Sequence, residues 1–259
     1  MAKLTELLTL QPDMAPDRKV EFLWVLSKMK SPALVLDVGC GGSIIAKYLS
    51  NHGFDVTAAD IDPAAGLYWN GEVRSNFVLI DCRYPLWTNR FDYVLIISTL
   101  EHLDWRDAVL MVNGLGRSLK VGGRMFITVP YGEGPMKVGV HIEKGYNKEN
   151  MTMLLSPETR VASSTVFTKK QIGWDAKDIF CIELERANEG ELPKRLFSIE
   201  LKTWPGGTIP FMARAVSDED AKLQGQNFLL PRRWKGRVGK VKCLEPASQV
   251  SIYGAKTHV

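Results

Sequence analysis

A short apolar stretch that runs straight into a cluster of glycines is the feature that most constrains how this chain folds. Residues 33–38, Ala-Leu-Val-Leu-Asp-Val, lie between Pro32 and the glycines, which predicts a strand buried on both faces. From residue 44 apolar residues recur at helical spacing, and the pattern stops at Asn51-His52-Gly53, a sequence typical of a helix end. The chain therefore predicts a strand, a glycine turn and a helix in succession.

The glycine turn favours a ligand that approaches the backbone closely. Gly39 and Gly41 carry no side chain and can adopt positive φ angles. A dinucleotide-binding fingerprint would place a third glycine at the position of Ile44, so that class of ligand is disfavoured. Asp37 beside the turn would repel a pyrophosphate, whereas it suits an ammonium or a sulfonium cation. The residues therefore predict a cationic nucleoside that carries no phosphate.

The segment Asp37-Val38-Gly39-Cys40-Gly41-Gly42-Ser43 resembles the first motif of the class I S-adenosylmethionine-dependent methyltransferases. The resemblance continues downstream and covers roughly residues 33 to 130. It implies an α/β fold, with a doubly wound, Rossmann-like, mostly parallel sheet, an antiparallel last strand and helices on both faces. It also implies S-adenosyl-L-methionine as the cofactor, bound by Asp37, Gly39, Cys40 and Gly41.

A second strand is predicted over residues 54–60, and it ends at an acid. An acid at the end of the second strand of a doubly wound sheet reaches a ribose, because both ribose hydroxyls donate to a carboxylate. Asp60 is therefore expected to bind the ribose, with Ile61 beside it. The alternative is that Asp60 is only a turn residue in Asp60-Ile61-Asp62-Pro63.

Two further strands are predicted to bring residues to the same edge of the sheet. The strand over 76–80 ends at Asp81 and Cys82, and the resemblance implies that Asp81 accepts a hydrogen bond from the adenine amine. The alternative is that Asp81 is a surface-loop residue. The strand over 89–97 leads to Ser98 and Thr99, which are expected near the methionine part of the cofactor, since open parallel sheets bind ligands at this edge.

Three residues are candidates for catalysis. His102 lies in Leu100-Glu101-His102, which resembles a stretch after the fourth strand in many small-molecule members of the family, and a neutral imidazole there could accept a proton. Capping or packing is the alternative role for His102. Tyr131 and His141 lie in a long loop expected after the fifth strand, 125–130, where they would face an acceptor. His141 is the alternative proton acceptor.

Helices are expected at two places outside the first unit. The N-terminal segment should form one with Asp17 as its cap and with four apolar residues on one face: Val20, Leu23, Trp24 and Met29. The other helix is expected from Asp104, as cap, to about Lys120.

The end of the sheet is less certain in sequence. Residues 160–167 and 178–185 are extended runs that suit an antiparallel hairpin, with Gly173-Trp174 in the turn. Residues 196–202 form a third run that competes for the last strand.

Composition places the chain among single large α/β domains with an appendage. Hydrophobic residues make up 45% of the 259 residues, the net charge is +4, and no run of eighteen apolar residues or signal-peptide pattern occurs, which predicts a soluble cytoplasmic protein. The scattered cysteines predict neither a disulfide nor a metal site. We expect an N-terminal helical segment over 1–30, a methyltransferase domain over 31–204 and a basic, partly disordered extension over 205–259.

The expected activity is methyl transfer to an oxygen or nitrogen of a small metabolite or saccharide. Residues 97–100, Ile-Ser-Thr-Leu, replace the motif used for adenine amino-methylation, and no cysteine has the proline neighbour typical of pyrimidine carbon-5 methylation. A nucleic-acid methyltransferase using the basic stretch 231–242 is one alternative. A cofactor-binding interaction subunit without catalysis is the other. No membrane partner is expected, and the sequence leaves the oligomeric state open.

Overall fold

The computed structural model divides the chain into two compact units, Met1–Ala187 and Asn188–Val259. The boundary expected from the sequence, after residue 204, lies later in the chain than this division. None of the helices in the described part of the chain is long and apolar enough to cross a membrane. The structure describes the following residues: 2–42, 44–68, 75–132, 134–138, 141–147, 151, 154, 158–172, 177–188, 195–203, 207–215 and 236–244.

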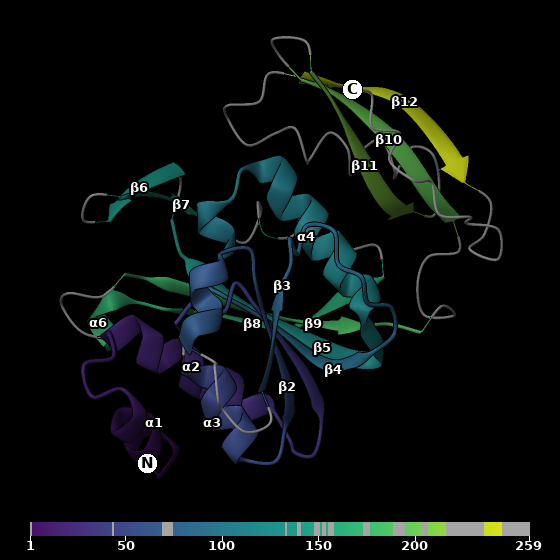
Figure 1. Ribbon diagram of the computed structural model, residues 1–259. Helices are drawn as coiled ribbons and strands as arrows, with labels where there is room; N and C mark the ends of the chain where they lie inside the picture. Colours follow the sequence, from purple (N-terminus) through teal and green to yellow (C-terminus); the bar gives the residue numbers. More distant parts are fainter. Residues whose placement is uncertain are drawn as a thin grey trace. The chain divides into compact units, whose positions relative to one another are not determined.

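The first unit is built on a seven-stranded sheet with the order β3-β2-β1-β4-β5-β9-β8 (Figure 1). Its strands are β1 (Leu34–Val38), β2 (Asp55–Asp60), β3 (Ser75–Leu79), β4 (Phe91–Ile97), β5 (Leu119–Pro130), β8 (Thr159–Phe167) and β9 (Ile179–Arg186). Neighbouring strands from β3 to β5 are parallel, whereas β9 is antiparallel to both β5 and β8. The doubly wound, mostly parallel sheet is confirmed. Its antiparallel strand, β9, is the last strand of this sheet in chain order and lies between β5 and β8.

The sheet has a topological switch at β1. Strands β2 and β3 continue the sheet on one side of β1, while β4 and β5 continue it on the other. In open α/β sheets of this kind ligands bind at the carboxyl ends of the strands beside the switch. This places the candidate site at the ends of β1, β2, β4 and their neighbours.

The end of the sheet confirms the predicted hairpin. Strands β8 and β9 pair antiparallel, with Thr165 opposite Cys181. The competing run, residues 196–202, forms no part of this sheet. Gly173-Trp174, expected in the turn, lies outside the described residues.

Helices cover both faces of the sheet (Figure 1). One buried cluster joins Phe22 and Leu49, from the helices on one side, to Val35, Leu95 and Phe126 of β1, β4 and β5. The alternate strand residues are buried as well, on the side of the sheet where α4 lies. The helices are α1 (Ala2–Leu10), α2 (Pro16–Lys28), α3 (Ile45–Asn51), α4 (Trp105–Ser118) and α6 (Lys169–Ile172), with short 3₁₀ turns η1 (Pro63–Tyr68) and η2 (Leu100–His102).

Helix α2 differs from the sequence expectation. Ala15 precedes the helix without a side-chain cap bond, Pro16 opens it, and Asp17 lies in its first turn, so the prediction of Asp17 as the cap is wrong. Proline suits this position because its fixed φ is already helical and its missing N–H is not needed there. The buried residues inside the helix are Glu21, Phe22, Val25 and Leu26. The predicted apolar face is therefore correct only in part, since Met29 is buried while Leu23 and Trp24 are partly buried against the same core.

The helix predicted after the fourth strand is confirmed. Asp104 caps α4 by accepting a hydrogen bond from the Asp107 backbone N–H at 2.8 Å. An aspartate at this position satisfies one of the free N–H groups at the helix start.

The segment after β5 is more regular than the expected loop. Strands β6 (Gly134–Val138) and β7 (His141–Gly145) form an antiparallel pair, so the expectation of a long loop is wrong. The signal in the sequence is weak: Met136, Lys137 and Val138 alternate in β6, but Ile142 is the one apolar residue of β7, and glycines flank both strands.

The second unit contains a three-stranded antiparallel sheet. Strand β10 (Arg195–Thr203) lies between β11 (Gly207–Ala215) and β12 (Gly236–Leu244). Ile199 is paired with Phe211 on one side and Val241 on the other, so apolar positions match across all three strands. Residues 236–244 of the basic extension therefore form a regular strand, rather than a disordered tail.

Glu183 joins three elements of the first unit. Its carboxylate is 3% exposed and accepts hydrogen bonds from Lys28 of α2 at 2.8 Å, Ser163 of β8 at 2.6 Å and Arg124 of β5 at 2.6 Å. Burial opposes ionisation, yet these donors and the charges of Lys28 and Arg124 lower the pKa of Glu183 below its usual range. The carboxylate is thus held ionised at the junction of α2 with the sheet.

We expect Glu183→Ala to lower the free energy of unfolding by about 1–3 kcal/mol near neutral pH, because Lys28 and Ser163 lose a charged acceptor. Urea unfolding measures this. Since the pKa of Glu183 is lowered in the fold, its contribution is present above the ordinary glutamate value and is lost as the pH falls through the folded value. The variant and the parent should therefore converge in acid. Glu185→Ala is the control, because both of its partners, Arg160 and Arg124, are about half exposed and such pairs contribute below about 1 kcal/mol.

Candidate functional site

The glycine turn is fixed to the neighbouring strand by its backbone. Gly39 N–H and Cys40 N–H both donate to the Ala59 carbonyl of β2, at 2.8 and 3.2 Å. Gly39 has φ +66° and Gly41 has φ +45°, the left-handed region that glycine adopts without strain. The turn is therefore fixed to the end of β2, and both glycines have the positive φ angles that the sequence analysis considered for them.

The two glycines serve different purposes. A Cβ at Gly39 would lie 2.5 Å from Thr99 Cγ2, so the end of β4 approaches the turn too closely for any side chain there. Thr99 is fixed in this position, because its Oγ1 donates to the Val38 carbonyl at 3.1 Å. A Cβ at Gly41 would meet nothing within 4 Å, so this part of the turn faces open space. Gly39 is required for packing, whereas Gly41 leaves room for a ligand.

Asp37 ends the central strand in a buried position. Its side chain is 2% exposed, and within the described residues no donor forms a hydrogen bond with its Oδ2. Burial raises the pKa of Asp37 to about 7, with Arg18 lowering it and Asp60 raising it further. An unsatisfied buried carboxyl oxygen is costly, and a cationic ligand would remove that cost.

Asp60 forms the turn contacts that the sequence analysis gave as its alternative role, whereas its expected role in binding a ribose stays a prediction. Its Oδ2 accepts from the Gly41 N–H at 2.8 Å, and its Oδ1 accepts from the Asp62 N–H at 2.9 Å, as in a turn aspartate. Each carboxylate oxygen has a second lone pair, so acceptor capacity for two hydroxyls remains. Ile61 is 64% exposed next to it, which leaves an apolar surface free beside the acid.

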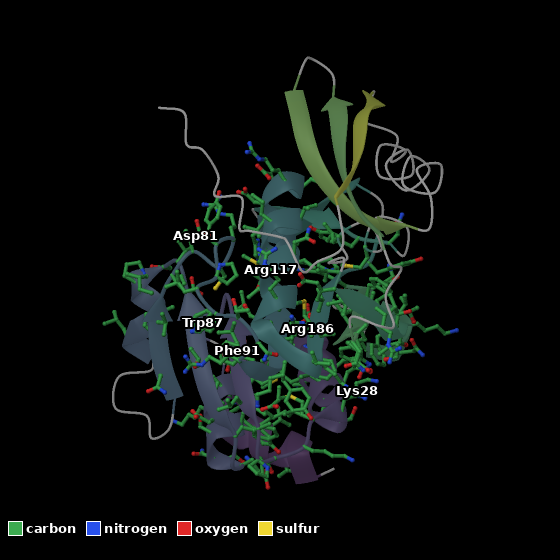
Figure 2. The ribbon with its side chains drawn as sticks, turned by 90° about the vertical axis from the view of Figure 1, so that its right-hand side faces the viewer. Lys28, Asp81, Trp87, Phe91, Arg117 and Arg186 are labelled. Carbon is green, nitrogen blue, oxygen red and sulfur yellow. The ribbon has the colours of Figure 1, made fainter. Side chains whose placement is uncertain are left out.

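Asp81 follows β3 and is held by an arginine that the sequence analysis did not consider. Arg83 donates to both carboxylate oxygens of Asp81, at 2.6 to 2.9 Å, and also pairs with Asp107 of α4. These hydrogen bonds lower the pKa of Asp81. Figure 2 shows Asp81 well apart from Phe91, which opens β4, so Asp81 lies toward the other end of the strands.

The thiol of Cys82 shows that the three predicted acids converge. Cys82 is buried, and its pKa is raised to about 12, first by burial and then by the negative charges of Asp81, Asp60 and Asp37. Three carboxylates from the ends of β1, β2 and β3 therefore act electrostatically on the same side chain. The result is an anionic edge of the sheet, as needed for a cation.

Two charged residues of α2 belong to this edge, and the sequence analysis missed both. Glu21 is 1% exposed and accepts from Ser98 Oγ at 2.7 Å and from Thr128 Oγ1 at 2.8 Å, at the ends of β4 and β5. Arg18 pairs with Glu21 at 3.3 Å and lowers the pKa of Asp37. A glutamate on the buried face of an amphipathic helix is the signal that could have indicated them.

The three catalytic candidates come from different elements. The His102 side chain is exposed at the end of η2, and Tyr131 is half-buried just after β5, with its ring centroid 6.3 Å from that of Phe180. His141 opens β7, and its side chain is outside the described part of the structure. Catalysis by these residues stays a prediction.

Tyr146 is a further aromatic residue near this edge of the sheet. It is buried after β7, stacks on Trp105 with ring centroids 6.3 Å apart, and donates its hydroxyl to the Leu100 carbonyl at 3.0 Å. It thereby fixes η2, which carries His102.

Two surface hollows in the described part of the chain lie away from these residues. One is lined by Leu34, Asp55 and Asp92, at the amino ends of the strands, and the other lies between α1 and α3. Neither hollow is lined by Asp37, Asp60 or Asp81, or by the glycine turn.

Comparison with known proteins shows a match to a methyltransferase domain in part of the chain. Residues 36–127 match the family model described as a methyltransferase domain. The structure of a Burkholderia thailandensis 1,6-didemethyltoxoflavin-N1-methyltransferase, with bound 1,6-didemethyltoxoflavin and S-adenosylhomocysteine, has the same fold. Its TM-score is 0.56 at 21% identity, and the match covers 72% of this chain and 85% of that one. The chain therefore contains a segment that matches a methyltransferase domain, and it shares the fold of solved methyltransferases.

Other methyltransferases agree over shorter spans. A ubiquinone biosynthesis O-methyltransferase of Xanthomonas oryzae pv. oryzae is 31% identical over 103 residues, which are 37% of this chain and 42% of the relative. The match thus spans less than half of the relative's length. The structure of a glycopeptide N-methyltransferase complexed with (S)-adenosyl-L-methionine has a TM-score of 0.55 at 16% identity. The match covers 65% of this chain and 87% of that one.

The buried carboxyl group of Asp37 predicts an unusual pH dependence of stability. Because its pKa is about 7 in the fold against 3.8 ordinarily, the folded state binds more protons between these values, and stability falls as the pH rises through this range. We expect Asp37→Asn to remove this fall, so that the variant melts at a higher temperature than the parent at about pH 8.

Thermal unfolding from about pH 4.5 to 8.5 measures the effect, at about 1.4 kcal/mol per unit of pKa difference. Asp55→Asn is the matched control, since Asp55 is an exposed aspartate at the opposite end of β2. Parallel curves for Asp37→Asn and the parent would show that Asp37 is ionised in the fold at all these pH values.

Proposed function

We propose that this methyltransferase binds S-adenosyl-L-methionine and transfers the methyl group to an oxygen or nitrogen atom of a small metabolite or saccharide. The observation that carries the proposal is the buried Asp37 carboxyl group, whose Oδ2 has no donor among the described residues and lies beside the glycine turn. A cationic ligand would satisfy it. The family match over residues 36–127 supports the same cofactor.

The residues present fit this cofactor. Asp37 would face its cationic groups, Asp60 its ribose hydroxyls and Asp81 the adenine amine, with the Arg83 contact holding Asp81 in place. Arg18 is the cation of α2 that would face the methionine carboxylate. The remaining residues proposed to line the site are Gly39, Cys40, Gly41, Ile61, Cys82, Ser98 and Thr99.

The proposed chemistry needs little from the protein besides positioning. The cofactor supplies a methyl group that its sulfonium already activates for displacement. The chain's own residues would orient the acceptor and exclude water, and alignment of this kind contributes much of the rate. For a hydroxyl or ammonium acceptor, His102 is the proposed proton acceptor, with His141 as the alternative and Tyr131 beside the acceptor.

The small-molecule acceptor is preferred to a nucleic acid. The matching proteins named above are, by name, methyltransferases of ubiquinone biosynthesis, of 1,6-didemethyltoxoflavin and of a glycopeptide. The basic residues that suggested nucleic acid include Arg237, Lys240 and Lys242, which are part of a paired strand in the second unit. Both oxygen and nitrogen acceptors are retained, because these names include O- and N-methyltransferases.

Calorimetry with S-adenosylhomocysteine tests cofactor binding, and an absence of binding by the parent protein would overturn the proposal. We expect Asp60→Asn to weaken binding by about 1.5–3 kcal/mol, because the amide loses the charge and one acceptor oxygen. Asn keeps an oxygen for the Gly41 N–H. Asp62→Asn, two residues later on the exposed side of the turn, is the control. A lower melting temperature with unchanged affinity would assign Asp60 to the turn alone.

His102→Ala should lower turnover by about 10²–10⁴-fold, the usual contribution of a general base, while leaving the affinity for S-adenosylhomocysteine nearly unchanged. Formation of S-adenosylhomocysteine on a panel of small phenols, alcohols and amines measures turnover. His52→Ala is the matched control, because His52 caps α3 and contacts Glu6 of α1. Unchanged turnover of His102→Ala would leave positioning alone or His141 as the basis of catalysis.

A further inference from the structure

Ser98, the residue directly after β4, has a backbone conformation that serine does not favour. Ser98 has φ +47°, in the left-handed region. Apart from glycines, the described chain has one other residue there, Asn89, whose short amide side chain tolerates this region well. Serine lacks that tolerance, so the surrounding contacts must hold Ser98 in place.

Those contacts come from α2 and β5. Ser98 N–H donates to the Thr128 carbonyl at 2.9 Å, and Ser98 Oγ donates to Glu21 Oε1 at 2.7 Å. Thr128 Oγ1 donates to the same Glu21 oxygen at 2.8 Å. Glu21 is 1% exposed, so one buried carboxylate oxygen receives both hydroxyls at the ends of the two strands.

The conformation of Ser98 determines where the next residue lies. Thr99 packs against Gly39 so closely that a Cβ on the glycine would be 2.5 Å from it, and its hydroxyl bonds the Val38 carbonyl. A different φ at Ser98 would redirect Thr99 away from the glycine turn. The wall of the cofactor site thus depends on a strained residue that a helix far away in the sequence holds.

We propose that Glu21 is a positioning residue for the cofactor site, which holds Ser98 in the left-handed conformation and thereby keeps Thr99 against the glycine turn. The inference rests on the proposed function for its link to the cofactor. Glu21 acts through Ser98 and Thr99, and it reaches the site from outside the segment that matches the family model.

The decisive comparison is Ser98→Ala against Ser98→Gly, with Glu21 intact. Both variants lose the hydroxyl and any direct contact it makes with the cofactor. Alanine keeps the steric cost of the left-handed region, whereas glycine does not. We expect Ser98→Ala to bind S-adenosylhomocysteine about tenfold more weakly than Ser98→Gly, which corresponds to about 1.4 kcal/mol.

Glu21 itself is tested with the same readout. We expect Glu21→Ala to weaken binding about tenfold or more. The double variant that combines Glu21→Ala with Ser98→Gly should bind nearly as well as Ser98→Gly alone. Glu21→Gln keeps an oxygen that accepts both hydroxyls, so it should stay within about threefold of the parent. Asp17→Asn is the control for loss of a negative charge from α2, and it should bind as the parent does.

Equal affinities of Ser98→Ala and Ser98→Gly would overturn the inference, as would a double variant as weak as Glu21→Ala. A merely structural role of Glu21 predicts that glycine at position 98 gives no rescue. If Glu21→Ala does not fold, the Ser98 pair alone decides.

Failure of the proposed function has a different signature. A parent protein that binds no S-adenosylhomocysteine would remove the function, but thermal unfolding would still test Glu21. In that case Ser98→Gly should melt at a higher temperature than Ser98→Ala, and equal melting temperatures would overturn the positioning role.

Discussion

The burial of the Asp37 carboxyl group is the constraint on which the rest of the site depends. Strand β1 is central, between β2 and β4, so its carboxyl end is enclosed and Asp37 is 2% exposed. Removing an ionisable oxygen from water without a donor is unfavourable, and the raised pKa expresses this cost. A sheet selected for stability alone would place an apolar residue here. The fold therefore maintains a costly group at its ligand-binding edge, where such groups are typical of functional sites.

Helix α2 partly compensates this cost and makes the N-terminal segment part of the site. Arg18 is the cation whose charge opposes the raised pKa of Asp37, and it also pairs with the buried Glu21. Glu21 in turn joins strand ends that are 77 and 107 residues away in the chain. One helix thus supplies a positive charge to the end of β1 and an acceptor to the ends of β4 and β5. Removal of α2 would take away both effects, because Arg18 and Glu21 lie in the same turn of the helix.

Local patterns in the sequence were sufficient to predict the sheet and the acids at the ends of its strands. A strand followed by glycines, and acids at strand ends, are short-range signals, and parallel pairing then brings Asp37, Asp60 and Asp81 together around Cys82. The contacts of Glu21 depend on tertiary packing, which helical periodicity does not contain. Apolar periodicity chose the Trp24 side of α2, whereas a charged residue lies buried because two hydroxyls and Arg18 satisfy it.

Two other sequence predictions differ from the structure because tertiary pairing, rather than local pattern, decided the outcome. Glycines around residues 132–145 indicated a loop, but β6 and β7 form an antiparallel pair between them. Basic residues over 236–244 indicated a solvated tail, but Val238 and Val241 between them match apolar residues of β10. In both cases the turn residues or charges dominated the pattern, while pairing with a partner strand decided the structure.

The part of the chain that matches the family model and the part that would meet an acceptor are different. Residues 36–127 contain the glycine turn, the three acids and η2. Helix α2, strands β6 and β7 and Tyr146 lie outside this range, yet each connects to it, α2 through Glu21 and the segment after β7 through the Tyr146 hydroxyl on Leu100. Because these connections end at the carboxyl ends of β4 and β5, beside Ser98 and His102, changes in the outer segments would alter the acceptor side while leaving the acids of β1, β2 and β3 in place. Acceptor choice in this chain is therefore expected to depend on the outer segments, and cofactor choice on the shared strands.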